Sequence, residues 1–251
     1  MPQLTDPTFC KSISIIVPAY NEEKWISHTL ESINRAKNFL RERGGLPVEI
    51  LVADNASTDR TIEVAQALEV QLVHETIRGV AKVRNTAAKA ARGDTLIFVD
   101  ADVIVPETLL WRISQVLSDP ACIGGAVDTN YQPASISVKV YLQMWRMVGK
   151  MLRMAQGAVQ FLRRDAFFSL GGYDETLFMG EDVDLYWRLR RKARKQGSQV
   201  CLINDLRVTP SCRRFDQWPL WRTLVWTNPI VVFLFRRRKE FWDGWYQHPL
   251  R

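Results

Sequence analysis

Short runs of apolar, mostly β-branched residues alternate with longer segments of helical periodicity through the first hundred residues of this 251-residue chain. The run at 95–99, Thr-Leu-Ile-Phe-Val, is apolar throughout, which is typical of a strand covered on both faces. Strand–helix alternation of this kind predicts an α/β fold with a mostly parallel central sheet flanked by helices. The expected strands span residues 12–17 (ending at Pro18), 48–53, 70–74 and 95–99, and the expected helices span 22–40, 58–68 and 80–91.

The rhythm changes beyond Pro106, where helices and strands no longer alternate regularly. We found no internal repeat and no low-complexity linker, so the sequence favours one main domain with an extension. The expected helices span 108–117, 135–155 and 181–195, the expected strands span 123–129, 159–163, 199–203 and 206–209, and an apolar, aromatic stretch covers 218–235.

The charge is unevenly distributed. Residues 186–251 carry 15 basic and 4 acidic side chains, a net charge of +11, whereas residues 1–185 carry a net charge of −4. An acidic body with a basic tail favours a polyanionic partner or an anionic surface, and nucleic acid, membrane headgroups and phosphorylated substrates remain open at this point. A composition of 47% hydrophobic and 24% charged residues excludes a disordered or collagen-like chain.

The four cysteines lie far apart without metal-binding spacing, so we expect reduced thiols in the cytoplasm. Residues 1–10 lack the apolar stretch of a signal peptide. The longest apolar run, 230–235, has six residues, far below the roughly 18 that a membrane span needs. We therefore expect a soluble protein, or one bound peripherally to the inner face of the membrane.

Polar side chains follow the expected strands at the points where ligands bind in such sheets. Asp100 and Asp102 come directly after the strand at 95–99, and two carboxylates in this D-x-D arrangement can bind a hard divalent cation on a diphosphate. Solvated loop acids are the alternative reading. The apolar strand in front of them favours metal.

Asp54 begins a second polar segment, Asp-Asn-Ala-Ser-Thr-Asp, at the end of the strand at 48–53. Its carboxylate could accept a hydrogen bond from the N–H of uracil or guanine. An ordinary Asx turn with Ser57 or Thr58 as helix cap explains the same residues equally well.

Glu181 and Asp182 open the charged helix at 181–195. Acids in a first turn are favoured by the helix dipole, and Asp184 and Arg188 form an i,i+4 pair, but these effects explain Glu181 and Asp182 less well. A glycine turn at 78–85 opens a basic helix that could hold phosphate or be plain surface charge. The P-loop, Rossmann and hydrolase-elbow motifs do not occur.

Taken in order, these segments resemble family 2 glycosyltransferases of the GT-A fold. The resemblance runs from about residue 13 to residue 211, and each motif is weak alone whereas the ordered set is strong. The matching segments are Ile-Val-Pro-Ala-Tyr-Asn-Glu (16–22), Val-Ala-Asp-Asn-Ala-Ser-Thr-Asp (52–59), Arg-Asn (84–85), Phe-Val-Asp-Ala-Asp (98–102), Gly-Gly-Tyr-Asp-Glu (171–175) and Glu-Asp-Val-Asp-Leu (181–185).

The resemblance implies transfer of one sugar, with inversion, from a UDP- or GDP-linked donor to a saccharide or lipid-linked acceptor. Asp182 would be the general base with Glu181 beside it, and Mn²⁺ or Mg²⁺ would be the cofactor. Asp102 would hold the cation, with Asp100 facing ribose or the donor sugar beside it. The remaining nucleotide-sugar-binding residues would be Pro18, Tyr20 and Glu22 in the nucleotide pocket, Asp54 at the base and Arg84 at the nucleotide.

The chain departs from the family pattern after its late strands, where many relatives have a metal-binding histidine. This chain has Val-Thr-Pro-Ser-Cys-Arg-Arg at 208–214, which leaves the third protein ligand open. Arg213 and Arg214 could compensate the diphosphate charge directly. The Gln-x-x-Arg-Trp signature of processive synthases does not occur, so transfer of a single sugar is expected.

We expect a catalytic GT-A domain over residues 1–215, with a nucleotide-binding half at 12–105 and an acceptor-binding half at 106–215. Residues 216–251, here called the C-terminal extension, are basic, rich in Trp and expected to be helical. The extension could lie on an anionic membrane or pack on the domain, and packing is slightly favoured. No nucleic-acid motif appears, and no nucleic acid is expected as partner. The rival functions are a non-catalytic nucleotide-sugar- or carbohydrate-binding module and a sugar-nucleotide pyrophosphorylase.

Overall fold

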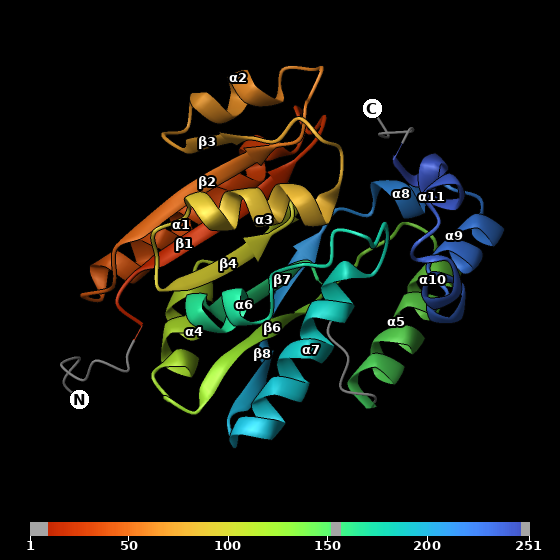
Figure 1. Cartoon of the computed structure of the whole chain (residues 1–251). Helices are drawn as coiled ribbons and strands as arrows, with labels where there is room; N and C mark the ends of the chain where they lie inside the picture. Colours follow the sequence, from red (N-terminus) through yellow and green to blue (C-terminus); the bar gives the residue numbers. More distant parts are fainter. Residues whose placement is uncertain (1–9, 152–156, 247–251) are drawn as a thin grey trace.

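A mixed eight-stranded sheet forms the centre of the computed structural model, which describes residues 10–151 and 157–246 (Figure 1). The strand order is β3-β2-β1-β4-β7-β6-β8-β5. Strands β1, β2, β3 and β4 are mutually parallel, β7 is antiparallel to both of its neighbours, and β6 pairs in parallel with β8. The strands are β1 (Ile13–Ala19), β2 (Val48–Asp54), β3 (Gln71–His74), β4 (Thr95–Val99), β5 (Val103–Ile104), β6 (Cys122–Thr129), β7 (Val159–Arg163) and β8 (Gln199–Pro210).

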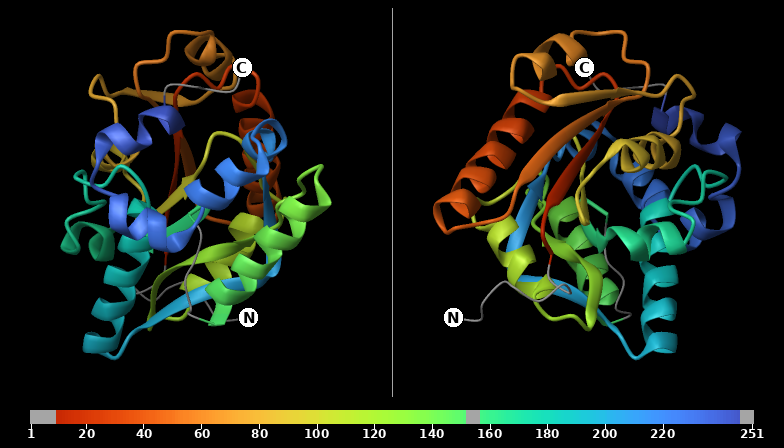
Figure 2. Two further views of the ribbon diagram at one scale, coloured as in Figure 1. Left: turned by 90° about the vertical axis from the view of Figure 1, so that its right-hand side faces the viewer. Right: turned by 60° about the vertical axis from the view of Figure 1, so that its left-hand side comes forward.

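Helices cover both faces of this sheet, as the uninterrupted apolar strands require. Successive residues of β1 show the two layers, because Ile15 and Val17 pack into the core beneath α1 and α4 whereas Ile16 packs into the core beneath α3, α6 and α7. Views from two further sides show the layers (Figure 2). The helices are α1 (Ile26–Glu42), α2 (Thr61–Gln66), α3 (Val80–Ala90), α4 (Leu109–Leu117), α5 (Ile136–Met151), α6 (Arg164–Ser169) and α7 (Glu181–Gln196).

The parallel pairing brings the carboxyl ends of β1, β2 and β4 to one edge of the sheet. Ala19 pairs with Asp54, and Ile16 pairs with Phe98, so the loops that follow these strands leave the sheet at the same edge. Most of the expected elements are present, with ends that differ by a few residues. The short strand β5 and the helix α6 were not expected from the sequence.

Two expectations about the first loops were wrong in detail. The strand at 12–17 does not end at Pro18 but pairs on to Ala19. The helix expected at 58–68 begins only at Thr61, and neither Ser57 nor Thr58 caps it. The Ser57 hydroxyl instead accepts a hydrogen bond from the backbone N–H of Asn21 (3.1 Å), and the Thr58 hydroxyl contacts the Asn21 side chain, so both tie this loop to the end of β1.

The two strands expected at 199–203 and 206–209 are one strand, β8. Its pairing with β6 jumps from Val127 opposite Ile203 to Asp128 opposite Arg207. A bulge at residues 204–206 therefore absorbs the break in the apolar pattern that suggested a turn.

The end of the chain forms the four short helices α8 (Arg213–Gln217), α9 (Leu220–Trp226), α10 (Pro229–Phe235) and α11 (Lys239–Tyr246). Trp218 and Trp242 are buried and lie edge-to-face on the ring of Trp226. The domain boundary expected at 215 falls within α8, and the side chain of Trp245 lies outside the described residues. Across residues 10–151 and 157–246, no helix combines the length and apolarity that crossing a bilayer demands.

Candidate active site

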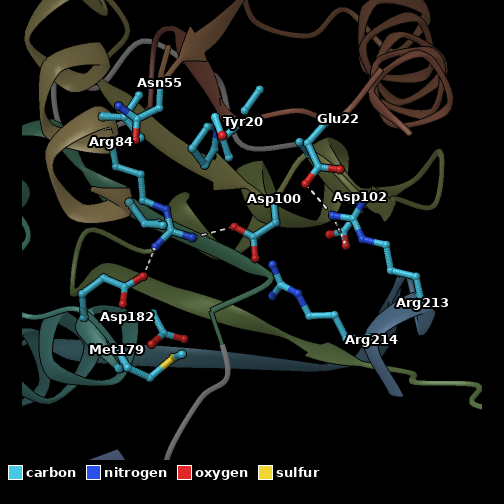
Figure 3. Close-up of a pocket in the computed structure, with 17 residues that line it drawn as sticks. Tyr20, Glu22, Asn55, Arg84, Asp100, Asp102, Met179, Asp182, Arg213 and Arg214 are labelled. Carbon is cyan, nitrogen blue, oxygen red and sulfur yellow. Dashed lines mark hydrogen bonds and ion pairs between the residues drawn. The ribbon is translucent and has the colours of Figure 1, made fainter. Parts of the chain in front are cut away.

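A cleft of about 280 Å³ lies where the loops after β1 and β4 meet the beginning of α7 (Figure 3). Asn55, Met179 and Gly180 also line it, and the sequence analysis did not single these residues out. Of the eleven site residues expected from the sequence, all but Asp54 line this one cleft: Pro18, Tyr20, Glu22, Arg84, Asp100, Asp102, Glu181, Asp182, Arg213 and Arg214.

Asp102 lies beside a cationic side chain. The Arg213 guanidinium bonds to the Glu22 carboxylate and lies 3.5 Å from a carboxylate oxygen of Asp102. Burial raises the pKa of Asp102 to about 6, with Glu22 and Asp100 adding to the rise and Arg213 opposing it. Arg213 reaches this place because β5 follows Asp102 directly and pairs with the end of β8.

Arg84 connects the loop after β4 to the start of α7. This buried side chain of α3 donates to Glu181 Oε1 (2.7 Å) and to Asp100 Oδ1 (2.5 Å). Its terminal nitrogens are thus engaged with two carboxylates from distant parts of the chain. The expected contact with a nucleotide stays a prediction, and the observed contacts give Arg84 a structural task that the sequence did not indicate.

Glu181 and Asp182 form the first turn of α7, which begins after Gly180 in the left-handed region (φ 74°). Burial raises the pKa of Glu181 to about 7, although Arg84 opposes the shift. Burial likewise raises the pKa of Asp182, with Arg84 again opposing. A carboxylate with a raised pKa is a better proton acceptor than a solvated one, which suits a general base.

Gly157 allows Asp182 to lie where it does. A Cβ atom at Gly157 would come within 2.2 Å of Asp182 Oδ2, so any other residue would displace the carboxylate. The backbone carbonyl of Asp182 accepts a hydrogen bond from Gln160 Nε2 (2.9 Å), and Gln160 accepts one from the Tyr173 hydroxyl (3.1 Å). Gly157 and Gln160 therefore both contact the base candidate, and Tyr173 holds Gln160 in place.

Asp54 lies at the end of β2 but faces its own loop. Asp54 Oδ1 accepts a hydrogen bond from the backbone N–H of Ser57 (3.2 Å), and Oδ2 lies 3.6 Å from His74 Nδ1. The bond to Ser57 is local, as the Asx-turn alternative implied, but the helix cap that this alternative included is absent. The next residue, Asn55, lines the cleft and holds the loop before α3 by accepting from Gly79 N (2.8 Å) and donating to the Ile77 carbonyl (2.9 Å).

The loop before α3 also contacts a residue that lines the cleft. The guanidinium of Arg78 lies 3.0 Å from the centre of the Tyr20 ring, a cation–π contact that fixes this ring beside the cleft. The sequence analysis suggested that the glycine turn at 78–85 could bind phosphate. The N–H of Gly79 in this turn already donates to Asn55 Oδ1.

The carboxylates of the cleft are too few to coordinate a divalent cation by themselves. Among the residues that the structure describes, no group of three or more His, Cys, Asp and Glu side chains is arranged to hold a metal. Asp100 and Asp102 offer two hard carboxylates, and Ser211, Cys212 and Arg213 stand where a histidine ligand was sought. This donor set fits Mn²⁺ or Mg²⁺ if diphosphate oxygens and water complete the coordination.

The chain is similar to known glycosyltransferases. Residues 14–170 match the family model described as glycosyl transferase family 2. The glycosyltransferase AglE of Haloferax volcanii is 27% identical over 239 residues, covering 90% of this chain and 75% of that protein.

Two solved structures have a similar fold. A mannosyltransferase from Pyrobaculum calidifontis, in complex with GDP-Man and Mn²⁺, aligns with a TM-score of 0.61 and 26% identity, and covers 81% of this chain. Glucosyl-3-phosphoglycerate synthase from Mycobacterium tuberculosis, with Mn²⁺, UDP and phosphoglyceric acid, aligns with a TM-score of 0.62 over 90% of this chain and 78% of that chain. At 20% identity, that second likeness concerns the fold alone. The chain spans 58% of the mannosyltransferase.

Proposed function

The chain belongs to glycosyl transferase family 2 and has its GT-A fold, and from this we propose an inverting transferase that moves one sugar from a UDP- or GDP-linked donor to an acceptor hydroxyl. The observation that carries the proposal is that Asp182 and the Asp100–Asp102 pair line the same cleft (Figure 3). A proton acceptor and a pair of carboxylates suited to a cation can thus flank one sugar carbon. The rival binding module has no use for this arrangement.

The donor would lie against the loops after β1 and β4. Pro18 and Tyr20 offer apolar surface for the nucleotide, and Arg213 and Arg214 offer positive charge for the diphosphate. Asp54 as the residue that binds the base stays a prediction, and its neighbour Asn55 is the polar group of that loop that lines the cleft.

Asp182 would act as general base. Its carboxylate takes the proton of the acceptor hydroxyl while the hydroxyl oxygen bonds to the anomeric carbon. The bond from that carbon to the diphosphate oxygen breaks, and its electron pair leaves with the diphosphate. Attack from the side opposite the leaving group inverts the configuration. A positioned base supplies about 10²–10⁴-fold in rate.

Asp102 and Asp100 would hold the Mn²⁺ or Mg²⁺. When bound, this cation would offset the negative charge that develops on the departing diphosphate. Arg84 would keep Asp100 and Glu181 in place, since it bonds to both carboxylates. Glu181 would then have a positioning role, because it bonds to Arg84 and precedes Asp182 in the first turn of α7.

We further propose a saccharide or lipid-linked acceptor, with residues 12–105 forming the nucleotide half and 106–215 the acceptor half of one domain. The antiparallel pairing of β4 with β7 joins these halves in one sheet, and the cleft takes residues from both. The C-terminal extension at 216–251 would stand outside this domain.

The test begins with the donor. Thermal unfolding of the chain is followed with UDP-, GDP- and dTDP-sugars, each with and without Mn²⁺, because a tightly bound donor raises the stability by mass action. We expect one nucleotide class to raise the Tm only when Mn²⁺ is present. No stabilisation by any of these donors would contradict the proposal.

Asp182→Asn then tests the chemistry. We expect this variant to retain donor-dependent stabilisation but to release nucleoside diphosphate at least about 10²-fold more slowly. Asp184→Asn is the matched control, because Asp184 lies in the same helical turn, pairs with Arg188 (2.7 Å) and does not line the cleft. Equal rates for the wild-type chain and Asp182→Asn would exclude Asp182 as the base.

A further inference from the structure

Exposed apolar side chains of the described residues gather on three helices. Of the fifteen large apolar side chains that are exposed there, eleven belong to α5, α9 and α10. We call this set the outer apolar face, and it consists of Ile136, Val140, Met144 and Met147 on α5, Leu220, Trp221, Leu224 and Val225 on α9, and Ile230, Phe233 and Leu234 on α10.

The α5 part of this face is a single stripe. Its four residues are spaced by four, four and three positions, which places them on one side of a helix. Val138 and Leu142 of the same helix are buried, so the opposite side of α5 packs on the protein. Ile136 (79%) and Met147 (68%) are the most exposed side chains of this stripe, so the stripe is largely open to solvent.

The three helices form one continuous surface. The hydroxyl of Tyr141 on α5 donates to the carbonyl of Leu224 on α9 (3.3 Å) and accepts from the Thr227 hydroxyl (3.1 Å). Helix α10 follows directly and contacts α9. The view onto this side of the molecule shows α5, α9 and α10 beside one another (Figure 2, left).

A basic segment borders the outer apolar face. Residues 236–239, Arg-Arg-Arg-Lys, follow directly after Phe235, the last residue of α10, and 237–239 are exposed. The guanidinium of Arg236 lies 4.6 Å from the centre of the Phe233 ring, so the charge adjoins the apolar surface itself. Apolar side chains edged by cations match the acyl and headgroup layers of an anionic membrane.

We propose that the outer apolar face docks onto anionic lipid membranes, with α5, α9 and α10 lying in the plane of the headgroups. Two copies of this chain are a poorer occupant, because a twofold interface over this face would bring two basic segments together. Trp218 and Trp242 are buried and cannot contact lipid, so the residues of the outer apolar face, including Trp221 and Phe233, would make the contact.

This docking would also place the cleft close to the lipid. Helix α10 packs on the loop before α7, where a Cβ at Gly180 would lie 3.2 Å from Val232 Cγ1. The Phe178 N–H donates to the Arg236 carbonyl in the same contact (2.7 Å). Gly180 lines the cleft next to Glu181, so, if the function proposed above holds, an acceptor anchored in the lipid layer would lie within short reach.

The experiment is co-sedimentation of the full chain with vesicles, in the absence of donor. Vesicles of phosphatidylcholine alone are compared with vesicles that also contain phosphatidylglycerol. We expect binding that requires the anionic lipid and falls as salt is added. This experiment measures vesicle binding alone and no sugar transfer. A chain that binds vesicles but fails the donor and transfer tests above would therefore contradict the proposed function and not the docking.

Variants locate the surface. Ile230→Ser/Phe233→Ser/Leu234→Ser should lower the partition coefficient at least about tenfold, and Lys239→Ala about fivefold. Val140→Ser/Met147→Ser tests α5 independently should the triple variant fold poorly by circular dichroism. Ile77→Ser is the matched control, since Ile77 is 58% exposed, lies outside the face and should leave binding unchanged.

Three results would overturn the proposal. The first is a wild-type chain that stays in the supernatant with every vesicle. The second is unchanged binding by both serine variants. The third is a lipid-free dimer in the ultracentrifuge that the triple variant dissociates, together with no vesicle binding.

Discussion

Arg84→Met should destabilise the fold in a way that depends on pH. Arg84 is 3% exposed and bonds to Glu181 and Asp100, and Met keeps most of its volume without the charge. Burial raises the pKa of Glu181 from 4.5 to about 7 in the folded chain. Between these two values the folded state binds the extra proton, so the contribution of Glu181 to the wild-type stability falls as the pH rises, and this contribution levels off above about pH 7.

Without Arg84, the ionised form of Glu181 loses its compensating charge, and its folded pKa rises further. The stability of the variant should therefore continue to fall above pH 7, by about 1.4 kcal/mol per pH unit. At pH 6, where Glu181 is largely neutral, we expect a loss of about 1–2 kcal/mol, mainly from unmade hydrogen bonds. At pH 8.5 the loss should reach about 3–5 kcal/mol, the usual cost of an uncompensated buried charge.

Urea unfolding followed by circular dichroism at several pH values measures both losses. Arg84→Met/Glu181→Gln should recover the part of the additional loss at pH 8.5 that comes from Glu181, because this buried carboxylate is then absent, whereas Asp182 remains. Arg112→Met is the control: its pair with Asp205 is exposed (37% and 60%), so its loss should stay below about 1 kcal/mol at every pH. Parallel pH curves for Arg84→Met and the wild-type chain would refute the reasoning.

Two further predictions concern the cleft. Gly157→Ala should slow transfer about 10²-fold, because its Cβ would displace the Asp182 carboxylate, and an unchanged single-turnover rate would contradict this. Arg213→Ala should tighten Mn²⁺ binding in the absence of donor, since it frees Glu22 and Asp102 from a competing cation. Electron paramagnetic resonance of free Mn²⁺ measures this, and weaker binding in the variant would show that Arg213 supports the cation.

Much of the cleft could be predicted because strand ends are visible in sequence. Apolar runs followed at once by acids marked Asp100 and Asp102, and parallel pairing then brought these loops together with Pro18 and Tyr20. Local patterns carry this information, since the presence and the burial of a strand can be inferred from its own residues.

Contacts between distant residues could not be predicted in the same way. Glu22 and Arg213 are 191 positions apart, and nothing in either segment indicates the other. The same holds for Arg84, whose bonds to Asp100 and Glu181 the sequence did not indicate, whereas its expected contact with a nucleotide stays a prediction. Arg213 and Arg84 both bond to residues that come close only when the whole sheet has formed.

The bulge in β8 governs where insertions in this part of the chain can be tolerated. An extra residue within 204–206 would enlarge a stretch that is already out of register and leave the pairing of Arg207 with Asp128 intact. An extra residue between Val208 and Ser211 would instead reverse the alternation of the strand, turning Arg213 away from Glu22. Natural variation in length should therefore concentrate upstream of Arg207, while the short span that leads into the cleft keeps a constant number of residues.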